Sequence, residues 1–67
     1  MKNKVRELRK NQKLTQDELA ELIGISRQAI NAFEKEKFDP SLPTAFKLSE
    51  LFKISIEELF IFKSLYY

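Results

Sequence analysis

The sequence of 67 residues predicts an all-α domain made of five short helices. Three observations predict this fold: the chain has a single glycine, most of its residues are good helix formers, and no stretch alternates cleanly between polar and apolar residues. With 43% apolar and 33% charged residues, the composition fits a folded chain rather than a disordered one. A chain of this length forms at most one domain, which we place over residues 1–67.

The first two helices are expected over residues 3–12 and 16–23. The second begins at a capping box, because Thr15 can accept a hydrogen bond from the first turn and Glu18 can return one to the backbone of Thr15. It ends at Gly24, which can adopt the left-handed conformation at no steric cost. These signals predict two separate helices with a short connection after each.

Three further helices are expected over residues 27–35, 42–52 and 56–60. Ser26 and Ser41 precede the first two of these and can cap them. Pro40 separates the two helices, because the residue before a proline disfavours the helical conformation. Ser55 and Glu58 repeat the capping-box pattern and open the last helix.

The segment 16–35 predicts a helix-turn-helix motif. Two helices of about eight residues meet at a short turn that contains Gly24, and the small Ala20 allows them to cross closely. Apolar residues at the spacing needed to hold the pair together are Leu19, Ile23, Ile25, Ile30 and Phe33. Several independent requirements of the motif are therefore met at fixed spacing.

The third helix has an apolar side and a polar side. At about 100° per residue, Arg27, Gln28, Asn31 and Lys35 form one continuous polar face, with Ala32 beside it. Arg can bind guanine and Asn or Gln can bind adenine through paired hydrogen bonds, while a methyl group can contact thymine. We therefore predict that Arg27, Gln28, Asn31 and Ala32 read bases in the major groove. The alternative is an ordinary solvated helix face.

Residues around this helix are predicted to contact the DNA backbone: Gln16, Ser26, Lys35, Lys37 and Ser41. Gln16 opens the second helix, where the side chain and the helix N-terminus can approach a phosphate. Lys35 and Lys37 lie at the end of the third helix and just beyond it. The alternative for each residue is simple capping or solvation, and for Ser41 capping alone is a sufficient role.

The charge distribution indicates a side that faces a polyanion, and the alternative from charge alone is an ordinary solvated helix surface. The net charge is only +2, yet six of the twelve Lys and Arg residues lie within the first thirteen positions. The chain has neither the long apolar run of a membrane span nor an apolar signal-peptide stretch. We expect a cytoplasmic protein that binds double-stranded DNA and no membrane.

Enzymatic function is not expected, because the residues that carry most catalytic chemistry are missing. The chain has no Cys and no His, so it lacks the usual zinc ligands, the commonest general base and any disulfide. It also has no phosphate-binding glycine loop, and the adjacent Glu57 and Glu58 point to different helix faces. We therefore expect no metal, no cofactor and no small-molecule ligand.

Taken together, these motifs resemble the phage-repressor and Cro-like helix-turn-helix family, also called the XRE type. The resemblance spans about Val5 to Phe60 and is carried by Leu14-Thr-Gln, Leu19-Ala, Ile25-Ser-Arg-Gln, Glu34, Pro40 and Leu48. It implies a compact five-helix, lambda-repressor-like domain that binds DNA in a sequence-specific way. It also implies a partly buried ion pair that ties Arg9 in the first helix to Glu34 at the end of the third.

Within that family the sequence looks most like small stand-alone bacterial regulators similar to a cytolysin repressor, through the segment Lys37-Phe-Asp-Pro-Ser-Leu. In these proteins the residues after the fifth helix form a short β element and help to build a homodimer, so a short C-terminal β element is expected here. The polar N-terminus Met1-Lys-Asn-Lys departs from their pattern. We therefore expect no N-terminal strand.

The C-terminal tail, about 56–67, is predicted to form a dimer interface, because it holds more apolar surface than so small a domain can cover. The predicted interface residues are Phe60, Ile61, Phe62, Leu65 and Tyr66. Closed two-fold dimers are the commonest oligomers, and two recognition helices about 34 Å apart would read an inverted repeat. The alternative is that the tail folds back over its own core.

The predicted function is a homodimeric transcriptional regulator, most simply a repressor. The alternative is an antitoxin or a restriction-modification controller protein whose main partner is another protein. Both alternatives keep the DNA-binding face, so the sequence alone does not separate them.

Overall fold

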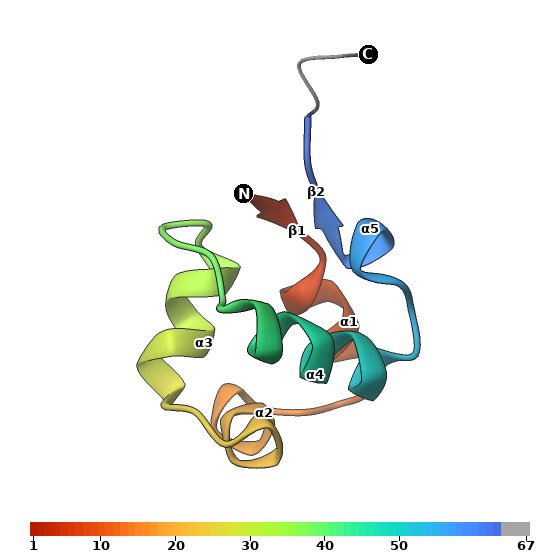
Figure 1. Cartoon of the computed structure of the whole chain (residues 1–67). Coiled ribbons are helices and arrows are strands. Elements are labelled where there is room, and N and C mark those ends of the chain that lie inside the picture. The colour runs from red at the N-terminus through yellow and green to blue at the C-terminus, as the bar shows by residue number, and fades with distance from the viewer. Residues whose placement is uncertain (64–67) are drawn as a thin grey trace.

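The computed structural model describes residues 1–63, over which the chain forms five helices and a two-stranded sheet (Figure 1). The helices are α1 (Val5–Asn11), α2 (Gln16–Ile23), α3 (Arg27–Glu34), α4 (Leu42–Phe52) and α5 (Ile56–Leu59). The strands are β1 (Lys2–Asn3) and β2 (Phe60–Ile61). The predicted five-helix architecture is therefore confirmed, and β2 is the C-terminal β element that the family resemblance implied.

The N-terminal strand β1 corrects the expectation that the polar N-terminus would form none. β1 pairs antiparallel with β2, with Lys2 opposite Ile61 and Asn3 opposite Phe60, and the amide of Lys4 donates to the carbonyl of Leu59 at 3.0 Å. Strand pairing uses backbone groups, so polar side chains do not prevent it when one face stays exposed.

Helix α1 begins at Val5 rather than at Asn3: Lys4 is its N-cap residue, and the side chain of Asn3 bonds to the first helical amide from the strand before it. The side-chain oxygen of Asn3 accepts a hydrogen bond from the amide of Val5 at 3.0 Å. The side-chain nitrogen of the same residue donates to the carbonyl of Phe33 at 2.9 Å. The side chain of Asn3 thus bonds both to the first amide of α1 and to the end of α3.

The predicted signals of the helix-turn-helix are present in the structure. The hydroxyl of Thr15 accepts from the amide of Glu18 at 3.0 Å, and the carboxylate of Glu18 accepts from the amide of Thr15 at 2.8 Å. Gly24 ends α2 with φ of 84°, in the left-handed region that favours glycine. Ser26 then caps α3 by accepting from the amide of Ala29 at 3.1 Å.

The remaining helices also start at their predicted caps. Ser41 accepts from the amide of Thr44 at 3.3 Å and opens α4. Ser55 and Glu58 form a complete capping box at the start of α5. This helix ends one residue before the predicted position, because the chain turns into β2 at Phe60.

The core lies where the five helices meet and is built mainly from aliphatic residues. Its fully buried side chains are Leu19, Ile30, Leu48, Leu59 and Val5. Ile30 and Phe33 contribute the apolar side of α3, as the helix periodicity predicted. The opposite side of α3 is therefore left free for another role.

The predicted dimer-interface residues divide into three groups. Phe60 is only 6% exposed and packs in the core of its own chain, so its side chain offers no free surface to a partner. Ile61 and Phe62 are 42% and 72% exposed. Leu65 and Tyr66 lie outside the described residues.

Candidate nucleic-acid interface

The polar face of α3 has the exposure that its sequence predicted. Arg27, Gln28 and Lys35 are exposed, while Asn31 and Ala32 are half-buried. These five residues lie on the side of the helix that does not face the core. The structure thus brings all four predicted base-reading residues onto one helix surface.

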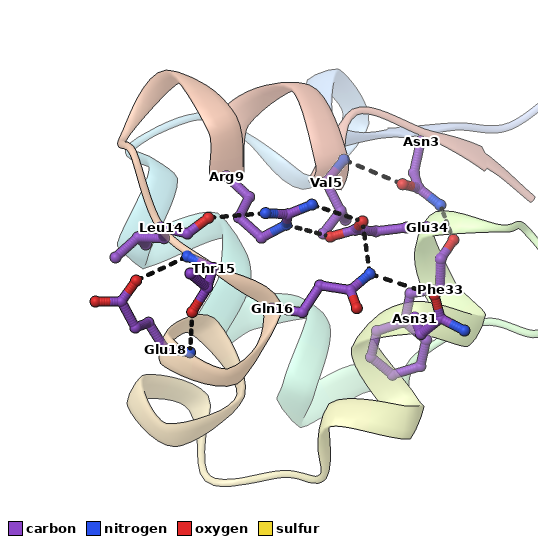
Figure 2. A network of polar contacts seen from close by, with 10 residues as sticks. All are labelled: Asn3, Val5, Arg9, Leu14, Thr15, Gln16, Glu18, Asn31, Phe33 and Glu34. Carbon is purple, nitrogen blue, oxygen red and sulfur yellow. Dashed lines mark hydrogen bonds and ion pairs between the residues drawn. The ribbon is translucent and has the colours of Figure 1, made fainter.

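Gln16, at the start of α2, is hydrogen-bonded to two residues of α3 (Figure 2). Its side-chain nitrogen donates to Oδ1 of Asn31 at 3.3 Å and to Oε1 of Glu34 at 3.1 Å. Within the described residues, the nitrogen of the Asn31 amide and the oxygen of the Gln16 amide have no hydrogen-bond partner. The amide nitrogen of Asn31 and the amide oxygen of Gln16 are therefore free to bond to a ligand at this part of the face.

The predicted ion pair joins α1 to the end of α3. Nε of Arg9 lies 2.6 Å from Oε2 of Glu34, and a second guanidinium nitrogen donates to Oε1 at 3.1 Å. A third contact runs from Arg9 to the carbonyl of Leu14 at 2.7 Å (Figure 2). The side chains of Arg9 and Glu34 are only 10% and 4% exposed. The hydrogen bond to Glu34 raises the pKa of Arg9, so the guanidinium stays charged in its buried position.

The hydrogen-bonded side chains form a chain from α1 to the polar face of α3. Arg9 holds Glu34, Glu34 accepts from Gln16, and Gln16 orients Asn31. Because each member bonds to the next, the position of Asn31 is set by contacts that reach three helices (Figure 2). Such connected polar networks fix side-chain geometry more strongly than separate pairs do.

A second contact between α2 and α3 lies closer to the start of α3. Nε of Arg27 is 3.9 Å from Oδ1 of Asp17, and the two side chains are 64% and 73% exposed. The distance indicates an electrostatic pair rather than a direct hydrogen bond. Consequently, the first turn of α2 contacts α3 at Arg27 as well as at Asn31 and Glu34.

Sequence reasoning missed Arg6, which lies beside the predicted interface. A hollow of about 310 Å³ is lined by Arg6, Arg9, Gln16, Asn31, Glu34 and Lys35. Since Arg9 and Glu34 neutralise each other, the exposed Arg6 and Lys35 leave this hollow with a positive charge. The basic N-terminal segment was the only signal of this role, because the position of Arg6 depends on how α1 packs against α3.

The predicted backbone-contacting residues are placed unequally. Lys35 borders the hollow just described, and Lys37 is exposed in the segment that follows α3. The hydroxyls of Ser26 and Ser41 are occupied as helix caps. That of Ser41 also donates to the hydroxyl of Thr44 at 3.0 Å. Capping is thus the role that the structure gives to both serines.

Two other kinds of site, a metal centre and a membrane span, have no candidate in the described part of the chain. Residues 1–63 contain no cluster of three or more acidic, His or Cys side chains arranged to hold a metal ion. None of the helices in this range combines the length and apolar character needed to cross a bilayer.

The fold and the outward polar helix define a DNA-binding helix-turn-helix domain. The sequence model of the helix-turn-helix family matches residues 5–59. The chain belongs to this family, in its XRE-type branch, and is an HTH-type DNA-binding transcriptional regulator rather than an enzyme.

Relatives of similar length agree with this assignment. An uncharacterized HTH-type transcriptional regulator of Methanocaldococcus jannaschii is 49% identical over 63 residues, which cover 94% of this chain and 96% of that protein. The uncharacterized HTH-type transcriptional regulator YgzD of Bacillus subtilis is 42% identical over 60 residues, covering 90% and 91%.

A solved structure confirms the fold. The crystal structure of the restriction-modification controller protein C.AhdI from Aeromonas hydrophila matches with a TM-score of 0.75 and 35% identity. The match covers 85% of this chain and 86% of that one. The lambda-repressor-like arrangement of five helices is therefore shared over nearly the whole described chain.

Proposed function

We propose that this regulator is a homodimeric repressor that reads an inverted-repeat operator through α3. The observation that carries the proposal is the outward polar face of α3, which the first turn of α2 holds through hydrogen bonds. A solvated face without a partner would not need side chains oriented by a network that reaches three helices. Double-stranded DNA is the expected partner, and a cytoplasmic location goes with it.

In this proposal Arg27, Gln28, Asn31 and Ala32 contact base edges in the major groove. Arg27 and Gln28 are exposed at the start of α3, the part of a recognition helix that enters the groove first. The free amide nitrogen of Asn31 can donate to an acceptor such as N7 of a purine or O4 of thymine.

Contacts to phosphates would set affinity and register. Gln16, Ser26, Lys35, Lys37 and Ser41 are the predicted contacts, and we add Arg6 because it lines the positively charged hollow. Among them Arg6 and Lys35 have the strongest support, since the two serine hydroxyls already cap helices. Removing the charge of either residue should reduce the slope of the salt dependence of binding by about one unit.

Dimerisation through the C-terminal tail is supported by the exposure of Ile61 and Phe62 next to the two-stranded sheet. Large apolar side chains exposed together usually mark an interaction surface. Leu65 and Tyr66 would extend this surface. A blocked promoter, with release through a partner protein, dilution or proteolysis, is the simplest mode of regulation for such a dimer.

A second candidate function is favoured by the structural match. C.AhdI is a restriction-modification controller protein, and it resembles this chain at 35% identity. As a controller protein or an antitoxin, the chain would bind DNA through the same face. It would in addition serve a restriction enzyme or a toxin as its partner. The likeness to a cytolysin-type repressor remains a third, narrower expectation that rests on the segment after α3. Neighbouring genes for a restriction enzyme or a toxin would separate these roles.

The experiment is a selection from a random duplex DNA pool at near-physiological salt, because protein–DNA affinity depends steeply on salt. We expect an enriched inverted repeat that is lost in the double variant Gln28→Ala and Asn31→Ala. An enriched half-site alone would keep the recognition role of α3 but contradict the dimer. Weak binding with no enriched sequence would overturn the proposal that this face reads sequence by itself.

A further inference from the structure

We infer that Asp17 is a positioning residue for base recognition, which orients Arg27 so that its terminal nitrogens face a guanine. The inference rests on the proposed function, in which Arg27 contacts a base. It concerns a carboxylate that lies next to Arg27 on the proposed DNA-binding face, where a negative charge lowers the attraction to phosphates. The contact with Arg27 supplies a benefit that offsets the weaker attraction to phosphates.

The geometry of the pair gives that role. The carboxylate lies beside Nε of Arg27, at 3.9 Å, and within the described residues no hydrogen bond engages the two terminal nitrogens of that guanidinium. A guanidinium that is held at Nε keeps its two terminal nitrogens free to donate hydrogen bonds. These two nitrogens can donate parallel hydrogen bonds to O6 and N7 of guanine.

The helix positions of the two residues explain why the pair forms. Arg27 is the first residue of α3, where the positive end of the helix dipole disfavours a cation, and the first turn of α3 contains no acidic residue. Asp17 lies in the first turn of α2, where a carboxylate is favoured. Asp17 therefore supplies from the neighbouring helix the negative charge that the first turn of α3 lacks.

The same pair should oppose binding to the wrong sequence. On non-operator DNA, an unrestrained Arg27 could turn to any nearby phosphate and add affinity without selectivity. The carboxylate of Asp17 holds the guanidinium away from this alternative and repels the phosphate. Asp17 thus favours the operator both by orienting Arg27 and by weakening its competing contacts.

The test measures base preference in the selected DNA pool, using variants of the full chain. Arg27→Ala first identifies the position that Arg27 reads, as the position at which guanine preference is lost. Asp17→Asn should lower guanine preference at that position by about twofold to fivefold, the range expected for an exposed ion pair. Asp17→Glu, which keeps the charge, should retain part of the preference.

Two controls separate positioning from a general charge effect. Glu21→Gln removes the same charge one turn further along the exposed side of α2 and should leave the preference at this position unchanged. In the Arg27→Ala background, Asp17→Asn should have no further effect on that position. Because Asp17 is 73% exposed, Asp17→Asn should lower the thermal midpoint of unfolding only slightly, through the lost contact with the helix dipole of α2, and the chain should stay folded.

The possible outcomes are distinct. An unchanged guanine preference in Asp17→Asn overturns the inference, and so does an equal effect of Glu21→Gln or an effect that persists without Arg27. A wild-type protein that selects a sequence with no position dependent on Arg27 also overturns it, while leaving operator recognition in place. A wild-type protein that selects no sequence overturns the proposed function itself.

Discussion

The two ends of the molecule differ in how their side chains are held. Figure 1 places α2 and the two-stranded sheet at opposite ends. Where α2 packs against α1 and α3, Gln16 and Glu34 are fixed by hydrogen bonds and a buried ion pair that join three helices. At the sheet end, each strand has two residues, and Phe62 beyond it is 72% exposed. The α2 end, which carries the proposed base-reading face of α3 and is called the reading end, is thus organised within one chain, whereas the sheet end leaves apolar surface that a second copy could cover.

The largest effect is expected from breaking the ion pair that organises the reading end. Glu34→Ala leaves the guanidinium of Arg9 buried without its partner and removes one acceptor of Gln16. Loss of one partner of a buried pair typically costs about 3–5 kcal/mol. We expect a decrease of that size in the free energy of unfolding, measured by urea denaturation.

The exposed Glu21 on α2 provides the matched control for this change. Glu21→Ala removes an equal charge and should change the free energy of unfolding by no more than about 0.5 kcal/mol. A loss below about 1 kcal/mol in Glu34→Ala, the range of an exposed pair, would contradict the view that this contact organises the reading end.

The sheet end should respond in the opposite way, with little loss of stability and a large loss of DNA affinity. Phe62→Asp places a charge on the proposed dimer surface, and Phe62 is exposed in the single chain. We expect a monomer in analytical ultracentrifugation. We also expect an affinity for the full inverted repeat that is lower by about 100-fold, because the two half-sites would no longer be bound together.

Phe46 on α4, which is 52% exposed, is the matched control for an apolar-to-acidic change. Phe46→Asp should leave the dimer intact, and affinity for a single half-site should be equal in both variants. A dimer that persists in Phe62→Asp would place the interface elsewhere. A wild-type protein that sediments as a monomer at micromolar concentrations would remove the dimer altogether.

The same contrast explains which features were predictable from sequence. The caps Thr15, Ser26 and Ser41 and the turn at Gly24 depend on neighbours within a few residues, so local sequence determined them. The polar face of α3 followed from helix periodicity for the same reason. These local signals were sufficient to predict α3, its polar face and the helices on either side of it.

Features that depend on packing between distant segments were not predictable. The strand β1 forms because its backbone meets β2 at the far end of the chain, and the polarity of its side chains gave the opposite expectation. The position of Arg6 beside the interface and the pairing of Asp17 with Arg27 both depend on how helices cross. The Arg9–Glu34 pair was the exception, because the family resemblance supplied it.

The smallest effect concerns acid stability and compares the two capping boxes, one at each end. The backbone amide and then the hydroxyl of Thr15 lower the pKa of Glu18 below its ordinary value. The hydroxyl and then the backbone amide of Ser55 lower the pKa of Glu58. Because both pKa values are lower in the folded state, each ionised carboxylate stabilises the fold at pH values above about 4.3, the pKa of an unfolded glutamate. That stabilisation is lost as the pH falls through the folded pKa.

Glu18→Gln and Glu58→Gln keep a side-chain acceptor at the third helical position but remove its titration. Each variant should therefore lose less stability than the wild type between about pH 5 and pH 3, with the difference measured by urea denaturation at each pH. An NMR titration of the two carboxyl carbons would give the pKa of each group separately. Two lowered pKa values would show that the capping boxes of α2 and α5 are both formed in solution. The contrast between the two ends would then lie only in the apolar surface beyond α5. A pKa lowered at Glu18 and ordinary at Glu58 would show that the capping box at the start of α5 is not held in solution, and the difference between the ends would then extend into the fold.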